Sequence, residues 1–186
     1  MESIILASQS PRRKQLLEWA EIPFEVLVSN TDEDFPQGLT PDKIAEHIAL
    51  NKAKAVMSES NAGKTILAAD TIVVCEGEIL GKPTDRAHAI ETILKLSGKS
   101  HEVITGVAIF RDGLFSVFHE TTVVSFHELS VDQISFYVDR YKPYDKAGAY
   151  AIQEWIGVVG IKEIKGDFYN VMGLPVSKVV QRLMAF

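Results

Sequence analysis

Two adjacent arginines stand where a helix usually carries acidic residues. In the segment SQSPRR (8–13), Ser10 suits the N-cap of a helix and Pro11 its first position. Arg12 and Arg13 then fall in the first turn, where unpaired N–H groups and the helix dipole already carry positive charge. Two serine hydroxyls lie in the same short stretch. This combination favours an anion-binding site over a solvated helix surface.

Asp70 is a second residue whose position points to chemistry. It interrupts the apolar run ILAADTIVV, which is typical of a central strand. Burying a charged, unpaired carboxylate costs several kcal/mol, so Asp70 needs a cation, hydrogen bonds or a raised pKa. An aspartate bonded to backbone N–H groups at a strand end is the alternative. Functional carboxylates often lie near the carboxyl ends of sheet strands, and we therefore favour a functional role.

Lys52 lies on the apolar side of a helix expected over residues 41–59. At about 100° per residue it falls within about 20° of Ala45, in the stripe that the helix should bury, whereas Lys54 points the opposite way. Lys52 could extend to the edge of the core or reach a phosphate, and its position favours neither. Lys82, in the turn GKP, is typical of a surface lysine but could reach the same site as Asp70.

Two further segments suggest ligand contacts more weakly. In YDKAGAYAIQ (144–153), Gly148 indicates a close backbone approach, Lys146 adds a cation, and Gln153 carries both a donor and an acceptor. The acidic run TDED (31–34) could contribute to a Mg²⁺ site, although composition favours a solvated loop. The Gly-Lys-Thr of NAGKT (61–65) is not a P-loop, because it precedes a strand instead of following one.

The elements that would position these residues alternate between strands and helices. Strands are predicted at 3–8, 24–29 and 64–76, and a hairpin of two strands turns at Asp112-Gly113. Helices are predicted after Ser10, at 41–59, at 84–98, at 130–141 and from about residue 175. Ser130 and Gln133 form a capping box at the start of the helix 130–141. Residues 76–79 are predicted as a turn and 157–164 as a strand. This mixture predicts an α/β fold with a mixed sheet flanked by helices.

Charge and composition limit the class of partner. The chain has 186 residues and a formal net charge of −6, which disfavours binding to a nucleic acid polymer or to an anionic membrane and favours a small phosphate ligand. Its single cysteine, Cys75, cannot form an internal disulfide and is expected to be a buried thiol. We find no signal peptide or membrane span in the sequence and therefore expect a cytoplasmic protein.

The motifs resemble those of the Maf proteins in kind and in order. SQSPRR (8–13), TDE (31–33), AADTIV (68–73), GKP (81–83) and YDKAGAYAIQ (144–153) carry the resemblance over nearly the whole chain. Maf proteins are nucleoside triphosphate pyrophosphatases related in fold to inosine triphosphate pyrophosphatases. The resemblance implies a single domain over residues 1–186, with two lobes and a central cleft. It also implies hydrolysis of a nucleoside triphosphate to the monophosphate and pyrophosphate, with Mg²⁺ or Mn²⁺ as cofactor.

The resemblance also implies roles for individual residues. Asp70 matches the family's proton acceptor, and Glu33 an acidic residue that would share the metal with Asp70. Arg12, Thr71 and Gln153 match the positions at which the family distinguishes its substrates. The DKAGAYAIQ form together with Thr71 resembles the branch acting on dTTP and UTP rather than the branch acting on 7-methyl-GTP. The substrate-binding residues that it implies are Ser8, Arg12, Arg13, Lys52, Thr71, Lys82, Lys146 and Gln153.

A function of a different class stays open at this point. A nucleotide-binding regulator of cell division or septum formation would need the same cations but no turnover. Asp70 discriminates between the two, because a binding protein does not need its carboxylate. In either case the partner is a small nucleoside triphosphate, and the sequence is compatible with a homodimer.

Overall fold

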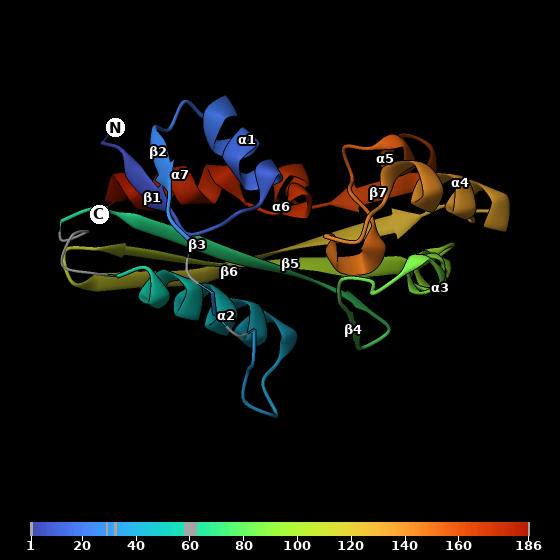
Figure 1. Cartoon of the computed structure of the whole chain (residues 1–186), viewed down its shortest axis with the longest axis horizontal. Helices are drawn as coiled ribbons and strands as arrows, with labels where there is room; N and C mark the ends of the chain where they lie inside the picture. Colours follow the sequence, from blue (N-terminus) through green and yellow to red (C-terminus); the bar gives the residue numbers. More distant parts are fainter. Residues whose placement is uncertain (1, 29, 32, 58–62, 186) are drawn as a thin grey trace. The chain divides into compact units, whose positions relative to one another are not determined.

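The computed structural model describes residues 2–28, 30–31, 33–57 and 63–185, and it shows a mixed sheet with helices packed on it (Figure 1). The strands pair in the order β2-β1-β3-β5-β6-β7, and β4 pairs with β3. Pairing is parallel between β1 and both β2 and β3, and antiparallel between β3 and β4 and between β6 and β7. The predicted mixed α/β sheet is therefore confirmed. The strands are β1 (Ile4–Leu6), β2 (Phe24–Val26), β3 (Ile66–Cys75), β4 (Glu78–Leu80), β5 (Ser100–Arg111), β6 (Leu114–Phe126) and β7 (Ile161–Lys165).

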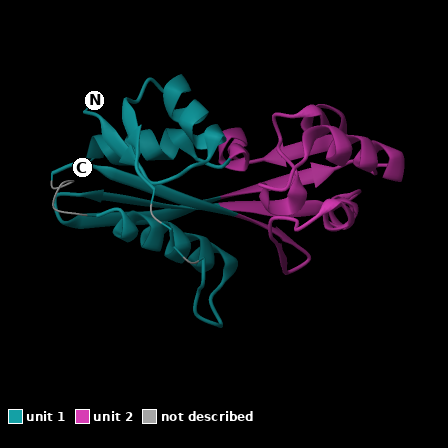
Figure 2. Ribbon diagram, in the orientation of Figure 1, with its two compact units in different colours: residues 1–71, 105–120, 173–186 teal, residues 72–104, 121–172 magenta. Residues whose placement is uncertain are grey.

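The described residues also form seven α-helices and one 3₁₀ helix. They are α1 (Pro11–Trp19), α2 (Pro41–Ala55), α3 (Arg86–Leu96), α4 (Val131–Tyr141), the 3₁₀ helix η2 (Ala147–Ala149), α5 (Trp155–Gly160), α6 (Phe168–Met172) and α7 (Val176–Ala185). The chain divides into two compact units (Figure 2). Unit 1 contains residues 1–71, 105–120 and 173–186, and unit 2 contains 72–104 and 121–172. Strands β3, β5 and β6 contribute residues to both units.

The core of unit 1 lies between α2 and the sheet. Ala49 and Ala53 of α2 pack with Ile5 of β1 and Ala68 of β3, all buried. Small residues let the helix approach closely, and Gly106 of β5 marks the tightest point. A Cβ atom on Gly106 would lie 2.2 Å from the backbone of Ala45. Figure 1 shows α1 and α7 on the opposite face of this part of the sheet.

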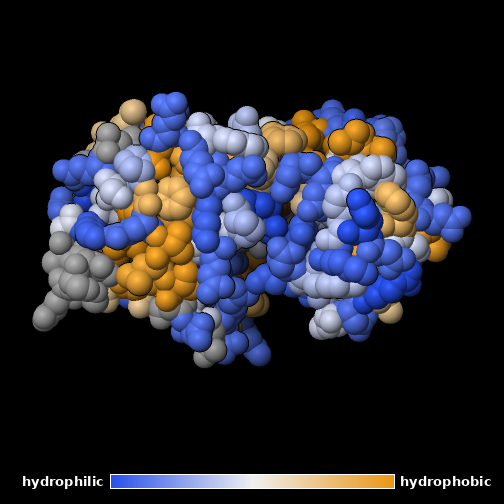
Figure 3. Space-filling view, turned by 45° about the horizontal axis from the view of Figure 1, so that its top comes forward, coloured by the Kyte–Doolittle hydropathy of each residue, from blue (hydrophilic) through white to orange (hydrophobic). Residues whose placement is uncertain are grey.

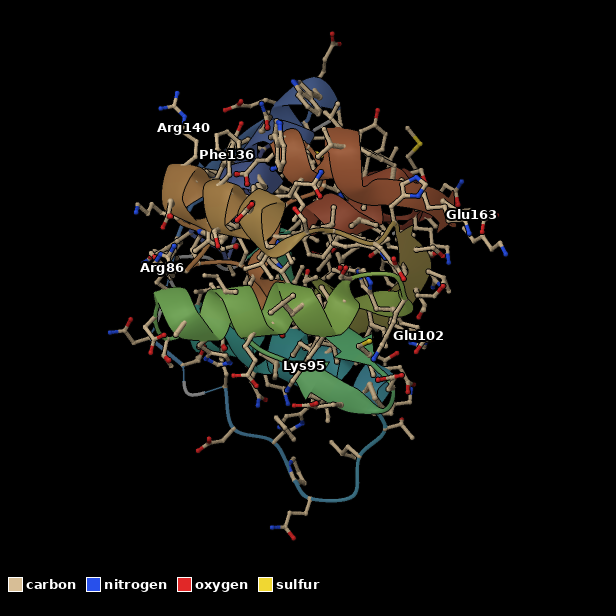
Figure 4. The ribbon with its side chains drawn as sticks, turned by 90° about the vertical axis from the view of Figure 1, so that its right-hand side faces the viewer. Arg86, Lys95, Glu102, Phe136, Arg140 and Glu163 are labelled. Carbon is tan, nitrogen blue, oxygen red and sulfur yellow. The ribbon has the colours of Figure 1, made fainter. Side chains whose placement is uncertain are left out.

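In unit 2, α3 and α4 pack side by side, as the end view of Figure 4 shows. Arg86 at the start of α3 donates two hydrogen bonds to Asp139 of α4, at 2.6 and 2.8 Å. Phe136 of α4 contacts Trp155 of α5 with ring centroids 4.9 Å apart. These contacts fix α4 to its neighbours within the unit.

The surface is mostly polar, with local apolar patches. Figure 3 shows apolar side chains gathered on one face of unit 1. Val26 at the end of the edge strand β2, together with Leu27 and Val28 just after it, is about two-fifths exposed. Across the residues that the structure describes, no helix has both the length and the apolar character needed to span a bilayer.

The long elements lie where the sequence predicts them. Asp112 and Gly113 both have positive φ at the turn between β5 and β6, and Ser130 and Gln133 form the predicted capping box of α4. Cys75 is buried in β3, and burial raises the pKa of its thiol. Gly148 has φ 68°, and a Cβ there would lie 3.0 Å from the side chain of Val73. The predicted close approach at Gly148 is therefore confirmed.

Four local predictions differ from the structure. Helix α2 ends at Ala55 rather than near residue 59. Residues 58–62 lie outside the described part of the chain, as do Ser29 of the second predicted strand and Asp32 of the acidic run. Within the predicted turn 76–79, Glu78 and Ile79 belong to β4. The predicted strand 157–164 begins as helix α5, because a short apolar run has no periodicity that distinguishes helix from strand. Helix α6 was not predicted.

Candidate functional site

Arg13 lies at the centre of a buried hydrogen-bonding cluster in unit 1. It belongs to the first turn of α1, and only 8% of the residue is exposed. Its Nε donates to the carbonyl oxygen of Gly173 at 2.8 Å, one Nη to Ser8 Oγ at 3.1 Å and the other to Thr71 Oγ1 at 3.0 Å. Among the described residues, two of the five guanidinium N–H groups thus remain for another acceptor.

Electrostatics around Arg13 act in opposite directions. Burial lowers the pKa of the guanidinium, the carboxylate of Asp70 raises it, and the neighbouring Arg12 lowers it again. Arginine keeps its proton under such conditions, so a fixed positive charge lies inside unit 1. A buried cation with spare donors and a second cation beside it is a good environment for a phosphate group.

The N-terminus of α1 retains its positive character. The helix has no acidic residue in its first turn, and Arg12 is half-buried there. Ser10 occupies the N-cap position as predicted, but its side chain makes no capping hydrogen bond. Its backbone N–H donates instead to Ser8 Oγ at 3.3 Å. The predicted location of the cap is confirmed, and the N–H groups of the first turn stay available to an anion.

Thr71 and Thr105 extend the cluster. Thr71 Oγ1 lies 2.9 Å from Thr105 Oγ1 and 3.4 Å from the carbonyl oxygen of Gly173. Thr105 on β5 is fully buried, and Gly173 has φ 120°. Sequence reasoning missed both Thr105 and Gly173. The threonine in the otherwise apolar strand segment VITGV is the signal that could have indicated the first.

Lys52 joins Asp70 to Glu33. Its Nζ donates to Asp70 Oδ1 at 2.6 Å and to Glu33 Oε1 at 2.8 Å. Asp70 is 8% exposed and lies in the middle of β3 rather than at its end, so the cation that its burial requires is Lys52. The contact with the more exposed Glu33 contributes little to stability, whereas removing Lys52 would leave the buried Asp70 carboxylate without its ammonium partner.

The carboxylates of Asp70 and Glu33 can be tested as ligands for a divalent metal. Both lie within hydrogen-bond distance of one ammonium group, so two hard oxygen ligands are close together. In the described part of the chain no group of three or more His, Cys, Asp or Glu could hold a metal ion. Two carboxylates are nevertheless sufficient for Mg²⁺, which usually keeps several waters and takes substrate phosphate oxygens. The pair therefore fits a magnesium-like ion that binds together with a phosphate ligand.

Unit 2 carries the three remaining predicted residues. Lys82 is exposed in the irregular segment after β4, and Gln153 is exposed in a turn before α5. Lys146 is 8% exposed, with Nζ 2.8 Å from Asp145 Oδ1 and 3.6 Å from Glu154 Oε1. Unit 1 brings together Ser8, Arg12, Arg13, Glu33, Lys52, Asp70 and Thr71. That all ten residues serve one ligand stays a prediction, as does the role of each.

Comparison with known proteins identifies the family. A family model described as "Maf-like protein" matches residues 3–186. A relative from Symbiobacterium thermophilum, named dTTP/UTP pyrophosphatase, is 50% identical over 186 residues, covering 100% of this chain and 95% of its own length. A relative of the same name from Porphyromonas gingivalis is 45% identical, with 98% of this chain and 94% of the relative covered. A HAM1 protein structure from Coxiella burnetii shares the fold, with a TM-score of 0.52, 17% identity and full coverage of both chains. The chain belongs to the Maf family.

Proposed function

We propose that this protein is a nucleoside triphosphate pyrophosphatase that hydrolyses dTTP and UTP to the monophosphate and pyrophosphate. The observation that carries the proposal is the presence together, within unit 1, of a buried guanidinium that has spare donors and of the buried Asp70 carboxylate, which is bonded to the half-buried Lys52. The substrate class follows from relatives 45% and 50% identical that are named dTTP/UTP pyrophosphatases.

Residues at the start of α1 would bind the phosphates. Arg13 would offer its two remaining N–H groups, Arg12 a second guanidinium and Ser8 its hydroxyl. A triphosphate carries enough negative charge to offset the unfavourable placement of two cations at a helix N-terminus. Because Arg13 is held by three hydrogen bonds, little of its side-chain freedom remains to be lost on binding.

Asp70 would orient the attacking water and accept its proton. The carboxylate is held by Lys52 in the middle of a central strand, which limits its motion. In this proposal water attacks the α-phosphorus, and pyrophosphate leaves. A divalent cation, Mg²⁺ or Mn²⁺, held by Asp70 and Glu33 would stabilise charge on the phosphoryl oxygens.

Recognition of the base would involve Gln153. Its amide can donate to a pyrimidine carbonyl and accept from N3–H, a pattern that thymine and uracil share and cytosine lacks. Its side chain is exposed in unit 2 and so is accessible to a ligand. Thr71, bonded to Arg13, would contribute to the choice of substrate through the position of that guanidinium.

A product-release assay tests the proposal. The protein is incubated with Mg²⁺ or Mn²⁺ and each common nucleoside triphosphate, and the products are separated. Pyrophosphate with TMP or UMP is the expected result, and Asp70→Asn should lose at least 100-fold in kcat while it still binds the triphosphate. Release of inorganic phosphate and a diphosphate would contradict attack at the α-phosphorus. Tight binding with no hydrolysis by the wild type under either metal would favour the nucleotide-binding regulator instead.

A further inference from the structure

A buried tyrosine in unit 2 holds the turn that presents Gln153. Tyr137 of α4 is fully buried, and its hydroxyl accepts a hydrogen bond from the backbone N–H of Ala151 at 3.1 Å. The same hydroxyl donates to Glu154 Oε2. One phenol oxygen therefore binds residues on both sides of Gln153, two positions before it and one position after it.

The turn between these two bonds is closely packed. The backbone N–H of Glu154 donates to the carbonyl of Ala151 at 3.1 Å, which closes the turn around Ile152 and Gln153. Ile152 is 4% exposed, whereas Gln153 is exposed. A Cβ on Gly157 of α5 would lie only 1.7 Å from the carbonyl oxygen of Ile152, so α5 supports the turn directly. Gln153 is thus the outward side chain of a fixed turn.

The network continues from Glu154 to Lys146. Glu154 Oε1 lies 3.6 Å from Lys146 Nζ, on the carboxylate whose other oxygen accepts from Tyr137. The hydroxyl of Tyr137 therefore helps to orient the carboxylate that faces Lys146, in addition to the backbone at Ala151. Two of the residues predicted to contact substrate depend on one buried oxygen atom.

We propose that Tyr137 is a positioning residue for substrate selection, acting through Ala151 and Glu154 on Gln153 and Lys146. The inference rests on the proposed function, because it assumes that Gln153 reads the base. The ring alone does not explain the arrangement. It stacks on Tyr141 with centroids 5.1 Å apart and planes 23° from parallel, a contact that phenylalanine would keep, whereas the hydrogen bonds to Ala151 and Glu154 require the hydroxyl.

Tyr137→Phe tests the inference because it removes a single oxygen atom. The KM for UTP and dTTP should rise about three- to tenfold, the fold-change expected when one or two hydrogen bonds that preorganise a ligand contact are lost. The preference for UTP over CTP, measured as the ratio of kcat/KM values, should fall by a similar factor, while kcat with UTP stays within about twofold. Tyr141→Phe is the matched control, since its hydroxyl takes no part in this network, and it should change none of these quantities.

Glu154→Gln gives a second, independent variant. It keeps the side-chain volume and an acceptor oxygen for Tyr137 but removes the more distant of the two carboxylate charges near Lys146, so the KM should rise by a smaller factor than in Tyr137→Phe. Thermal unfolding establishes that each variant is folded. If Tyr137→Phe does not fold, the KM of Glu154→Gln tests the inference in its place. A folded variant with unchanged KM and unchanged preference, or one that loses kcat alone, would overturn the inference.

Failure of the proposed function is distinguishable from failure of this inference. If the wild type binds triphosphates without hydrolysing them, the proposed function fails. The position of Tyr137 is then judged from calorimetric binding of UTP and CTP to the wild type and to Tyr137→Phe. Loss of the preference for UTP supports the inference, and an unchanged preference overturns it. If the wild type neither hydrolyses nor binds a triphosphate, both are overturned.

Discussion

At the scale of single residues, the two arginines that stand side by side in the sequence have different surroundings. Arg13 is buried and donates to Ser8, Thr71 and Gly173, whereas Arg12 is half-buried. The sequence suggests that both could be replaced with little loss of stability, since relief of the dipole conflict would compensate. The contacts of Arg13 change that expectation for one of them.

Arg13→Ala is therefore expected to lower the free energy of unfolding by about 2 to 4 kcal/mol, because Ser8, Thr71 and the Gly173 carbonyl each lose one hydrogen bond and a cavity forms. Arg12→Ala should lower it by less than about 1 kcal/mol. Both variants should weaken triphosphate binding. Urea denaturation measures the free energy of unfolding of each variant, and calorimetry measures its affinity for the triphosphate. Equal losses of stability in the two variants would contradict the distinction.

His101 makes stability depend on pH. It is 2% exposed, its Nε2 lies 2.7 Å from the hydroxyl of Tyr150, and burial lowers its pKa to about 4 from an ordinary value of 6.5. Its Nδ1 has no hydrogen-bond partner within the described residues. The unfolded chain therefore takes up the proton first as the pH falls. Stability that is fully present above about pH 6.5 is lost progressively as the pH falls toward 4.

Between pH 7.5 and 4.5 this single group should cost about 2 to 3 kcal/mol, at 1.36 kcal/mol for each unit of differential protonation. Carboxylates that become protonated over this range also lower the free energy of unfolding. The contribution of His101 is therefore measured by comparing the wild type with a variant that lacks the histidine. The free energy of unfolding is obtained from urea titrations of the wild type and of His101→Gln at both pH values. The variant should lose about 2 to 3 kcal/mol less than the wild type. Parallel losses in the two proteins would exclude His101 as the cause.

At the scale of elements, the length of a helix or strand and the strength of its sequence pattern decided whether it could be predicted. β3 is a long apolar run broken only by Asp70 and Thr71, α4 carries a complete capping box, and the Asp-Gly turn fits the hairpin of β5 and β6, so all three were predicted. Strand β4 has three residues and α6 has five, too few for a periodicity to be visible. Their conformations depend on pairing with β3 and on tertiary packing, which are not local properties.

The approach of α2 to β5 gives a prediction for an element contact. Gly106→Ala places a Cβ 2.2 Å from the backbone of Ala45, and backbone cannot move aside as a flexible side chain can. The helix must shift, and the free energy of unfolding should fall by about 1 to 3 kcal/mol or more. Gly81→Ala is the control, since its Cβ would meet nothing within 4 Å. Urea denaturation compares the two, and similar values would show that α2 accommodates the methyl group.

At the scale of the whole molecule, the sequence indicated which residues are out of place in their local pattern better than it indicated their partners. Asp70 was recognised as needing a cation, yet Lys52 lies 18 positions away and meets it only because α2 packs on β3. Gly173 bonds to Arg13 and Thr105 bonds to Thr71 from still more distant segments, and both were missed. A residue type out of place in a local pattern is visible in the sequence, whereas the partner that compensates for it depends on the fold. Cytoplasmic location and the homodimer stay predictions.

The net charge of −6 and the local cluster of cations together predict selective stabilisation by a small anion. A non-hydrolysable UTP analogue at about 100 times its Kd should add about 2.7 kcal/mol to the free energy of unfolding. For a chain of this size that corresponds to a rise in Tm of about 5 to 10 °C in a thermal melt. At the same concentration of the analogue, the rise in Tm should be smaller in Arg12→Ala, because its Kd is expected to be higher. A single-stranded oligonucleotide at the same phosphate concentration should leave Tm unchanged, because the overall negative charge repels a polyanion that the local cations cannot hold. An equal shift with the oligonucleotide would show that the surface, and not this site, binds phosphate.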